Sequence, residues 1–226
     1  MNWQDKGILL SINKYNENSA IAEFYTKNHG KVAGIIFGAT SKKNKNYLIL
    51  GNKLHINYTN KNENKIGSFH IEILEVNTPY FFESRSKLAC IIYSIEIIKL
   101  LTPENQNNPK IYELLKHLFN FLNQDSWARD FIFWELNLFK NLGYEINFKD
   151  YVKLKNKDGI DIYVLKNDEY KIIPNFLVNN TNNINKIDII NAIEIIGDFL
   201  SKSILNENNL QIPSSRNELF KLIQKL

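Results

Sequence analysis

The residue types that most often carry catalysis are few and scattered in this chain. None of the four histidines lies at H-x-x-x-H or H-E-x-x-H spacing, and no GxxxxGK[ST] loop for nucleotide phosphates occurs. The only cysteine, Cys90, falls on the apolar side of a predicted helix and is expected to be a small core residue. We therefore expect a protein that is not an enzyme and that has no catalytic residue and no cofactor. The histidines are His29, His55, His70 and His117.

Cationic and aromatic side chains form a more informative pattern. Three lysines lie within four residues and are followed closely by Tyr47. Lysine binds phosphate as a point charge, and an aromatic ring can stack on an unpaired base. The run is therefore either a DNA-binding surface or a solvated loop, and Tyr47 is either a platform for a base or part of the core. The predicted DNA-binding residues are Lys42, Lys43, Lys45 and Tyr47, with Lys27, His29 and Lys31 at the turn "KNHG".

The charge distribution supports a surface of this kind in the first third of the chain. Residues 1–80 hold 10 lysines and 6 acids, whereas the remainder holds 18 Lys+Arg and 18 acids. All of the net charge of +4 therefore lies in residues 1–80, as expected for a weak polyanion-binding surface. An AT-rich coding sequence would also enrich lysine, so the placement of the lysines carries more weight than their number.

The elements that must position these residues are short strands. Five strand-like segments with turn residues between them occupy residues 1–78 and show no helical period. The longest connection follows the third strand and contains the lysine run. A five-stranded Greek-key barrel with this layout is an OB-fold. The predicted strands are 7–15, 19–26, 31–38, 54–60 and 67–76.

After Pro79 the hydrophobic period changes to that of helices. Apolar residues recur at helical spacing across residues 79–226, which predicts a mainly α-helical domain and an overall α+β fold. An irregular insert is expected at 144–184, with a possible hairpin at "NKDG". Ser215 and Glu218 have the S-x-x-E spacing of a capping box at the last helix. The predicted helices are 84–101, 110–124, 126–143, 185–205 and the segment after Pro213.

Targeting signals are not evident. No segment approaches the ~20 consecutive apolar residues of a membrane span. The opening "MNWQDKGILLS" lacks the basic region and long apolar run of a signal peptide. We therefore expect a cytoplasmic protein.

The opening "WQDKGILLSINKYNENSAIAEFYTKNHGKVAGIIFGA" resembles the N-terminus of the bacterial RecO family of recombination mediators. "FWELNLFKNLGYEINF" is similar to the entry into the C-terminal region of that family, and "IPSSRNELFKLIQ" is similar to its final helix in the alphaproteobacterial style. The matching positions are Trp3, Asp5, Gly7, Ile8, Leu10, Glu17, Ser19, Phe24, Thr26, His29, Gly30, Gly34, Gly38, Gly51 and Asn52.

The resemblance implies work on DNA without covalent chemistry. Members of the family bind single- and double-stranded DNA and anneal complementary strands. They also bind RecR and the C-terminal tail of single-strand-binding protein, and so help to load RecA onto coated strands. The resemblance thus implies a mediator of DNA repair and recombination that is associated with the nucleoid.

Two departures from the family are visible. Many members carry a cysteine zinc site in the region that matches 144–184, but this segment contains no cysteine or histidine. A tetrahedral zinc site needs about four such ligands, so no bound metal is expected. The family also usually carries arginine after the third strand, where this chain has lysine, which lacks the bidentate fork of arginine.

A site for the acidic, apolar-ended tail of single-strand-binding protein should pair a basic side chain with an apolar pocket. Arg129, beside Trp127 on the third predicted helix, is the candidate. The alternative is a surface arginine in a solvent-side ion pair. Two further functions remain open for the whole chain. One is an OB-fold interaction adaptor, and the other is a generic single-stranded nucleic-acid-binding protein without mediator activity.

Overall fold

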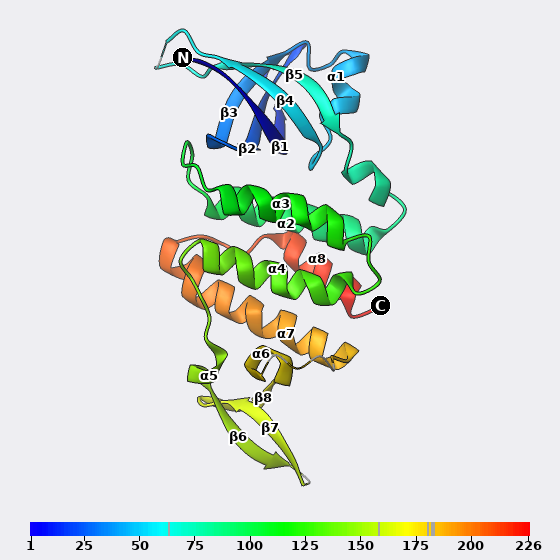
Figure 1. Cartoon of the computed structure of the whole chain (residues 1–226), viewed down its shortest axis with the longest axis vertical. Coiled ribbons are helices and arrows are strands. Elements are labelled where there is room, and N and C mark those ends of the chain that lie inside the picture. Colours follow the sequence, from blue (N-terminus) through cyan, green and yellow to red (C-terminus); the bar gives the residue numbers. More distant parts are fainter. Residues whose placement is uncertain (63, 158, 180, 182–183) are drawn as a thin grey trace. The chain divides into compact units, whose positions relative to one another are not determined.

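Five strands close into a barrel at the start of the chain in the computed structural model (Figure 1). The order around the barrel is β1-β2-β3-β5-β4, with β3 and β5 parallel and the other neighbours antiparallel. This is the layout of an OB-fold and confirms the predicted α+β class. The strands are β1 (Asn2–Lys14), β2 (Ser19–Thr26), β3 (Gly30–Phe37), β4 (Lys53–Thr59) and β5 (Ser68–Glu75). The structure describes residues 1–62, 64–157, 159–179, 181 and 184–226.

The long strand β1 makes the closure possible. Its first half pairs with β4 and its second half with β2, with a register irregularity between Leu9 and Ser11. Such an irregularity bends a strand and increases its twist, which lets one strand belong to both sides of a barrel. The interior is filled by alternate side chains that include Leu9, Phe24, Ile36, Leu54 and Phe69.

The connection after β3 differs from the expected loop. Residues Lys42–Tyr47 form the short helix α1, whose N-cap Ser41 accepts a hydrogen bond from the backbone N–H of Asn44 at 3.3 Å. Serine favours this position because its side-chain oxygen satisfies an orphan N–H of the first turn. None of the residues of α1 is buried, so the helix stands on the surface of the barrel.

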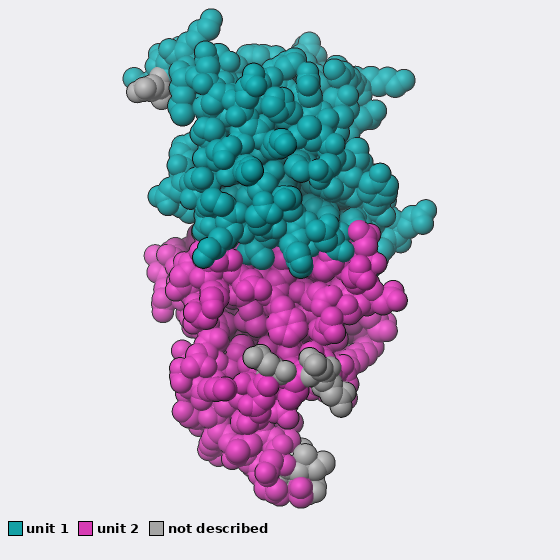
Figure 2. Space-filling view, in the orientation of Figure 1, with its two compact units in different colours: residues 1–120 teal, residues 121–226 magenta. Residues whose placement is uncertain are grey.

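Two helices pack with the barrel in the first of two compact units, residues 1–120 (Figure 2). After a 3₁₀ turn η1 (Thr78–Phe81) come α2 (Arg85–Leu101) and α3 (Pro109–Phe121). Strands give way to helices near residue 78, but the first compact unit extends beyond that point to Asn120. The helices α2 and α3 therefore lie almost entirely with the barrel.

The second unit, residues 121–226, contains helices and one small sheet. The helix α7 packs against α4, against α8 and against the strand β8. The elements are α4 (Trp127–Asn141), α5 (Phe148–Tyr151), β6 (Val152–Lys157), β7 (Ile160–Leu165), β8 (Asp168–Ile173), α6 (Asn175–Asn179), α7 (Lys186–Phe199), a π-helical turn η2 (Leu200–Leu205), η3 (Asn206–Asn208) and α8 (Ser214–Ile223).

The segment 144–184 is more regular than expected. It forms a three-stranded antiparallel sheet, in the order β6-β7-β8, between the short helices α5 and α6. The strands β6 and β7 form the predicted hairpin at "NKDG", of which Asp158 lies outside the described residues. Apolar side chains of this sheet such as Leu154 and Tyr170 are exposed, so no buried face with a clear period marks all three strands in the sequence.

The last helix begins differently from the prediction. The helix α8 starts at Ser214 with Pro213 as its N-cap, so Ser215 lies within the first turn rather than at the cap. A capping box does occur at α7, where the Asn185 side chain accepts from the backbone N–H of Asp188 at 2.9 Å. Further along α8, the buried Arg216 forms an ion pair with the buried Glu135 of α4. Buried charges require such partners, so this pair fixes α8 against α4.

Candidate nucleic-acid interface

The three lysines of α1 form an exposed cationic surface. Lys42, Lys43 and Lys45 are all exposed, and none forms an ion pair with another residue in the described part of the chain. Lys43 Nζ lies 5.9 Å from the centre of the Tyr47 ring, within reach of a cation–π contact. The Tyr47 ring itself is half-buried and packs against the barrel core. The lysines are therefore available to an anion, whereas Tyr47 mainly anchors the helix.

The three residues predicted at the turn between β2 and β3 differ in exposure and in their contacts. Lys27 is exposed. His29 is partly buried, with Nδ1 3.0 Å from Oδ2 of Asp5 and its ring stacked on Trp3. Lys31 is only 9% exposed, and its Nζ donates to the Lys99 carbonyl at 2.7 Å.

The environment of Lys31 is therefore that of a structural residue. Burial lowers the pKa of Lys31 from its usual value, and the nearby Glu23 and Glu104 oppose that shift. A phosphate could reach this ammonium only after its hydrogen bond to Lys99 is broken. Lys31 therefore does not belong with the exposed lysines Lys27, Lys42, Lys43 and Lys45.

The two predicted segments lie at opposite ends of β3 rather than side by side. The turn with Lys27 and His29 precedes β3, and α1 follows it. A strand of eight residues spans about 25 Å at the usual rise per residue. The connections at the two ends of β3 are therefore separated by the length of that strand, and the shared role of residues 27–31 and α1 in DNA binding stays a prediction.

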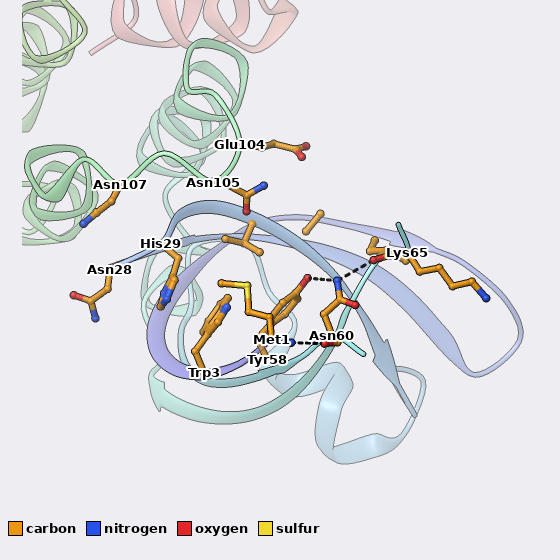
Figure 3. Close-up of a pocket in the computed structure, with 13 residues that line it drawn as sticks. Met1, Trp3, Asn28, His29, Tyr58, Asn60, Lys65, Glu104, Asn105 and Asn107 are labelled. Atoms are coloured by element: carbon orange, nitrogen blue, oxygen red, sulfur yellow. Dashed lines mark hydrogen bonds between the residues drawn. The ribbon is translucent and has the colours of Figure 1, made fainter. Parts of the chain in front are cut away.

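A cavity of about 760 Å³ lies against the turn at residues 27–30, within the first unit (Figure 3). Trp3 stacks between His29 and Tyr58, with ring centroids 4.0 Å and 4.7 Å away respectively. Sequence reasoning did not single out Trp3 as a site residue. Its pairing with Tyr58 depends on the β1–β4 register, in which the two residues are directly opposite, and register is not visible in one strand alone. The lining residues are Met1, Trp3, Asn28, His29, Val32, Ala33, Tyr58, Asn60, Lys65, Ile66, Glu104, Asn105 and Asn107.

The residues predicted to bind a protein tail lie at the start of α4 in the second unit. Trp127 is buried, with 4% of its surface exposed. The side chain of Arg129 is 42% exposed, and its Nη2 lies 2.8 Å from Oδ1 of Asp130. Nη2 also donates to Ser126 Oγ at 3.3 Å. Arg129 thus has the surface ion pair of the alternative interpretation, and any anionic ligand must compete with Asp130.

The segment 144–184 carries exposed ion pairs. Lys153 pairs with Glu169, and Lys155 Nζ lies 2.8 Å from the same carboxylate. The two ammonium groups lower the pKa of Glu169 to about 2. Among the described residues no group of three or more His, Cys, Asp or Glu side chains is arranged to hold a metal ion. Within the same residues no helix is long and apolar enough to span a membrane.

Two family models and several relatives match most of the chain. The family model described as "Recombination protein O N terminal" matches residues 1–77, and "Recombination protein O C terminal" matches residues 83–189. A protein of Ehrlichia chaffeensis named DNA repair protein RecO is 26% identical over 99% of this chain and 98% of its own length. The proteins of that name from Wolbachia pipientis wMel and Caulobacter vibrioides are 25% and 24% identical, over 98% and 96% of this chain and over 100% and 95% of their own lengths.

The two family models follow one another in the order of the barrel and the helices, and the relatives match nearly end to end. The chain belongs to the RecO family of DNA repair and recombination proteins.

Proposed function

We propose that this protein binds single- and double-stranded DNA and helps complementary strands to anneal without hydrolysing nucleotide. The observation that carries the proposal is the exposed lysine set of α1 on an OB-type barrel, in a chain of the RecO family. Exposed lysines without carboxylate partners are free to neutralise phosphates and release counterions. The site is thus a binding surface rather than a reaction centre.

Annealing needs little help from the protein in energetic terms. Each stacked base-pair step gains about 1.4 kcal/mol, so pairing is already downhill. The obstacle is repulsion between two phosphate backbones, which a cationic surface reduces. A net charge of +4 confined to residues 1–80 suits this task, because a strongly basic surface would retain the duplex product.

We further propose that the protein acts with RecR on strands coated by single-strand-binding protein and so helps to load RecA, in the cytoplasm at the nucleoid. The second unit is the proposed contact for the acidic tail of single-strand-binding protein. Arg129 would exchange its Asp130 partner for a carboxylate of the tail. Trp127, two residues earlier on α4, is the proposed apolar part of this contact and is 4% exposed.

The experiment is a strand-annealing assay in the absence of ATP, with naked strands and with strands coated by single-strand-binding protein. The proposal expects the wild-type protein to accelerate annealing of both substrates. Acceleration of naked strands alone would reduce the function to that of a generic single-stranded nucleic-acid-binding protein. Failure to bind either strand, combined with capture of RecR, would favour the interaction adaptor.

A further inference from the structure

The cavity beside the β2–β3 turn is lined by aromatic rings on one side and by asparagine side chains elsewhere. The edges of Trp3 and Tyr58 form one wall, and Asn105, from the segment between α2 and α3, lies across from them (Figure 3). Val32 and Ala33 of β3 add an apolar surface. Its volume of about 760 Å³ falls within the range of small-molecule sites.

The positions of the Trp3 and Tyr58 rings are fixed by neighbouring residues. Asp5 is 6% exposed, and its carboxylate accepts from the Asn28 backbone N–H at 2.7 Å and from the Asn28 side chain at 2.9 Å. This contact fixes the turn that places His29 on one face of Trp3, while Tyr58 covers the other face. A ligand therefore meets ring edges whose positions are already set, so binding costs little side-chain entropy.

Asn105 across from the rings, and Asn107 further along the lining, carry amide groups that the protein does not use (Figure 3). Within the described residues, neither the Asn105 nor the Asn107 side chain makes a hydrogen bond. Asn105 has a φ of +57°, and its backbone N–H donates to the Lys31 carbonyl at 2.8 Å. The backbone, not the side chain, thus holds Asn105 in place. An amide presents a donor beside an acceptor, which is the pattern that base edges match.

One exposed lysine belongs to the cavity lining and another to the adjoining turn. Lys65 lines the cavity, and Lys27 directly precedes Asn28 in the turn. Among the described residues of the lining, Glu104 is the single exposed carboxylate. These cations favour a ligand that carries phosphates, whereas Glu104 disfavours a peptide with several carboxylates.

We propose that this cavity holds one unpaired base of single-stranded DNA, and that it lets the protein distinguish single strands from duplex. The inference rests on the proposed DNA binding and adds to it a contact independent of the lysines of α1. A paired base is stacked inside the duplex and presents no free edge to Asn105 and Asn107. A base in a single strand can turn out of its stack at small cost and enter.

The test removes the amides and keeps the backbone. In the double variant Asn105→Gly with Asn107→Ala, glycine retains the left-handed conformation at 105. Asn209 has a matching φ of +56° and is exposed in the second unit, so Asn209→Gly is the matched control. Binding is measured by fluorescence anisotropy with an oligothymidylate, an abasic strand of equal length and a duplex.

The double variant should bind oligothymidylate about tenfold more weakly, as expected for losing the contacts to one base edge. Its affinity for the abasic strand and for the duplex should equal that of the wild type and of Asn209→Gly. Equal loss on all three probes, or none on oligothymidylate, would overturn the inference. Displacement of oligothymidylate from the wild type by an acidic peptide, but not from the variant, would reassign the cavity to a peptide. Binding of no probe by the wild type would remove the proposed function itself.

Discussion

Two lysines at the β2–β3 turn differ sharply in burial. Lys27 is exposed, whereas Lys31, four positions later, is 9% exposed and donates to the Lys99 carbonyl. An exposed ammonium is available to a phosphate and adds little to the stability of the fold, whereas a buried one contributes mainly to stability. The sequence "KNHGK" contains both without distinguishing them, because the difference depends on α2, far away along the chain.

This contrast gives a reciprocal prediction for Lys31→Met and Lys27→Met. Lys31→Met should lower the free energy of unfolding by about 1–2 kcal/mol, because it leaves the Lys99 carbonyl unpaired, and should leave the salt dependence of DNA binding unchanged. Lys27→Met should leave stability unchanged and reduce the slope of log affinity against log salt by about 0.8. Urea unfolding and salt-dependent anisotropy measure the two effects. The reverse pattern would contradict the assignment of either lysine.

Arg129 gives a second prediction at this scale. Arg129→Ala should slow annealing of strands coated by single-strand-binding protein about tenfold, the effect of losing one charge-assisted hydrogen bond, and leave naked strands unaffected. Lys149→Ala removes an exposed cation from the same unit and is the control. Equal rates on coated strands for wild type and Arg129→Ala would leave Arg129 as a surface residue paired with Asp130.

At the scale of elements, the weakest joint of the barrel is the contact between β3 and β5. Only Ile35–Ser68 and Ile36–Phe69 are in register there, whereas β1 and β4 share seven registered pairs. Gly34 lies beside this joint, and a Cβ at Gly34 would sit 2.5 Å from the Phe69 ring. The absence of a side chain at Gly34 therefore lets Phe69 fill the interior.

Gly34→Ala should destabilise the protein by about 1–3 kcal/mol through overpacking at this joint. Phe69→Leu frees space at the same place, so the double variant should lose less stability than the sum of the single variants. Thermal or urea unfolding of the four proteins gives the coupling energy. Strict additivity would show that Gly34 and Phe69 do not share the constraint.

The strands and long helices were predictable from the sequence because their side chains alternate or recur with a clear period. The turn at "KNHG" and the long connection after β3 also follow from local residue types. The helix α1 did not, since a six-residue helix has too few turns to show a period. Of the sheet at 152–173, the hairpin of β6 and β7 followed from the turn residues, whereas the third strand β8 did not, because exposed residues such as Tyr170 give it no apolar period. The Trp3 cavity depends on strand register and on the segment after α2, which only the folded chain brings together.

At the scale of the whole molecule, the first unit is larger than the barrel alone. The Tyr25 hydroxyl donates to the Asn108 carbonyl at 3.4 Å, and the Thr78 hydroxyl donates to the Leu50 carbonyl at 2.5 Å. Burial raises the pKa of Tyr25 to about 12, as expected for a phenol covered by its neighbours. Part of the barrel surface is thus shielded from solvent by segments between residue 78 and residue 120.

A fragment of residues 1–120 should therefore fold by itself and keep the DNA affinity of α1, whereas a fragment of residues 1–78 should expose apolar surface and aggregate. Chemical-shift dispersion in NMR spectra and anisotropy with an oligonucleotide measure these outcomes. A well-folded, monomeric 1–78 fragment would show that α2 and α3 are not needed by the barrel.

The central claim is that the exposed lysines of α1 bind DNA through its phosphates. The most direct measurement is the salt dependence of single-strand binding by the wild type and by the triple variant Lys42→Ala, Lys43→Ala and Lys45→Ala. The control is Lys149→Ala, Lys186→Ala and Lys221→Ala, which removes the same charge from exposed positions of the second unit. The α1 variant should lose about two units of the slope of log affinity against log salt, and the control should keep the wild-type slope. Equal slopes for the α1 variant and the wild type would contradict the claim and make α1 a solvated helix.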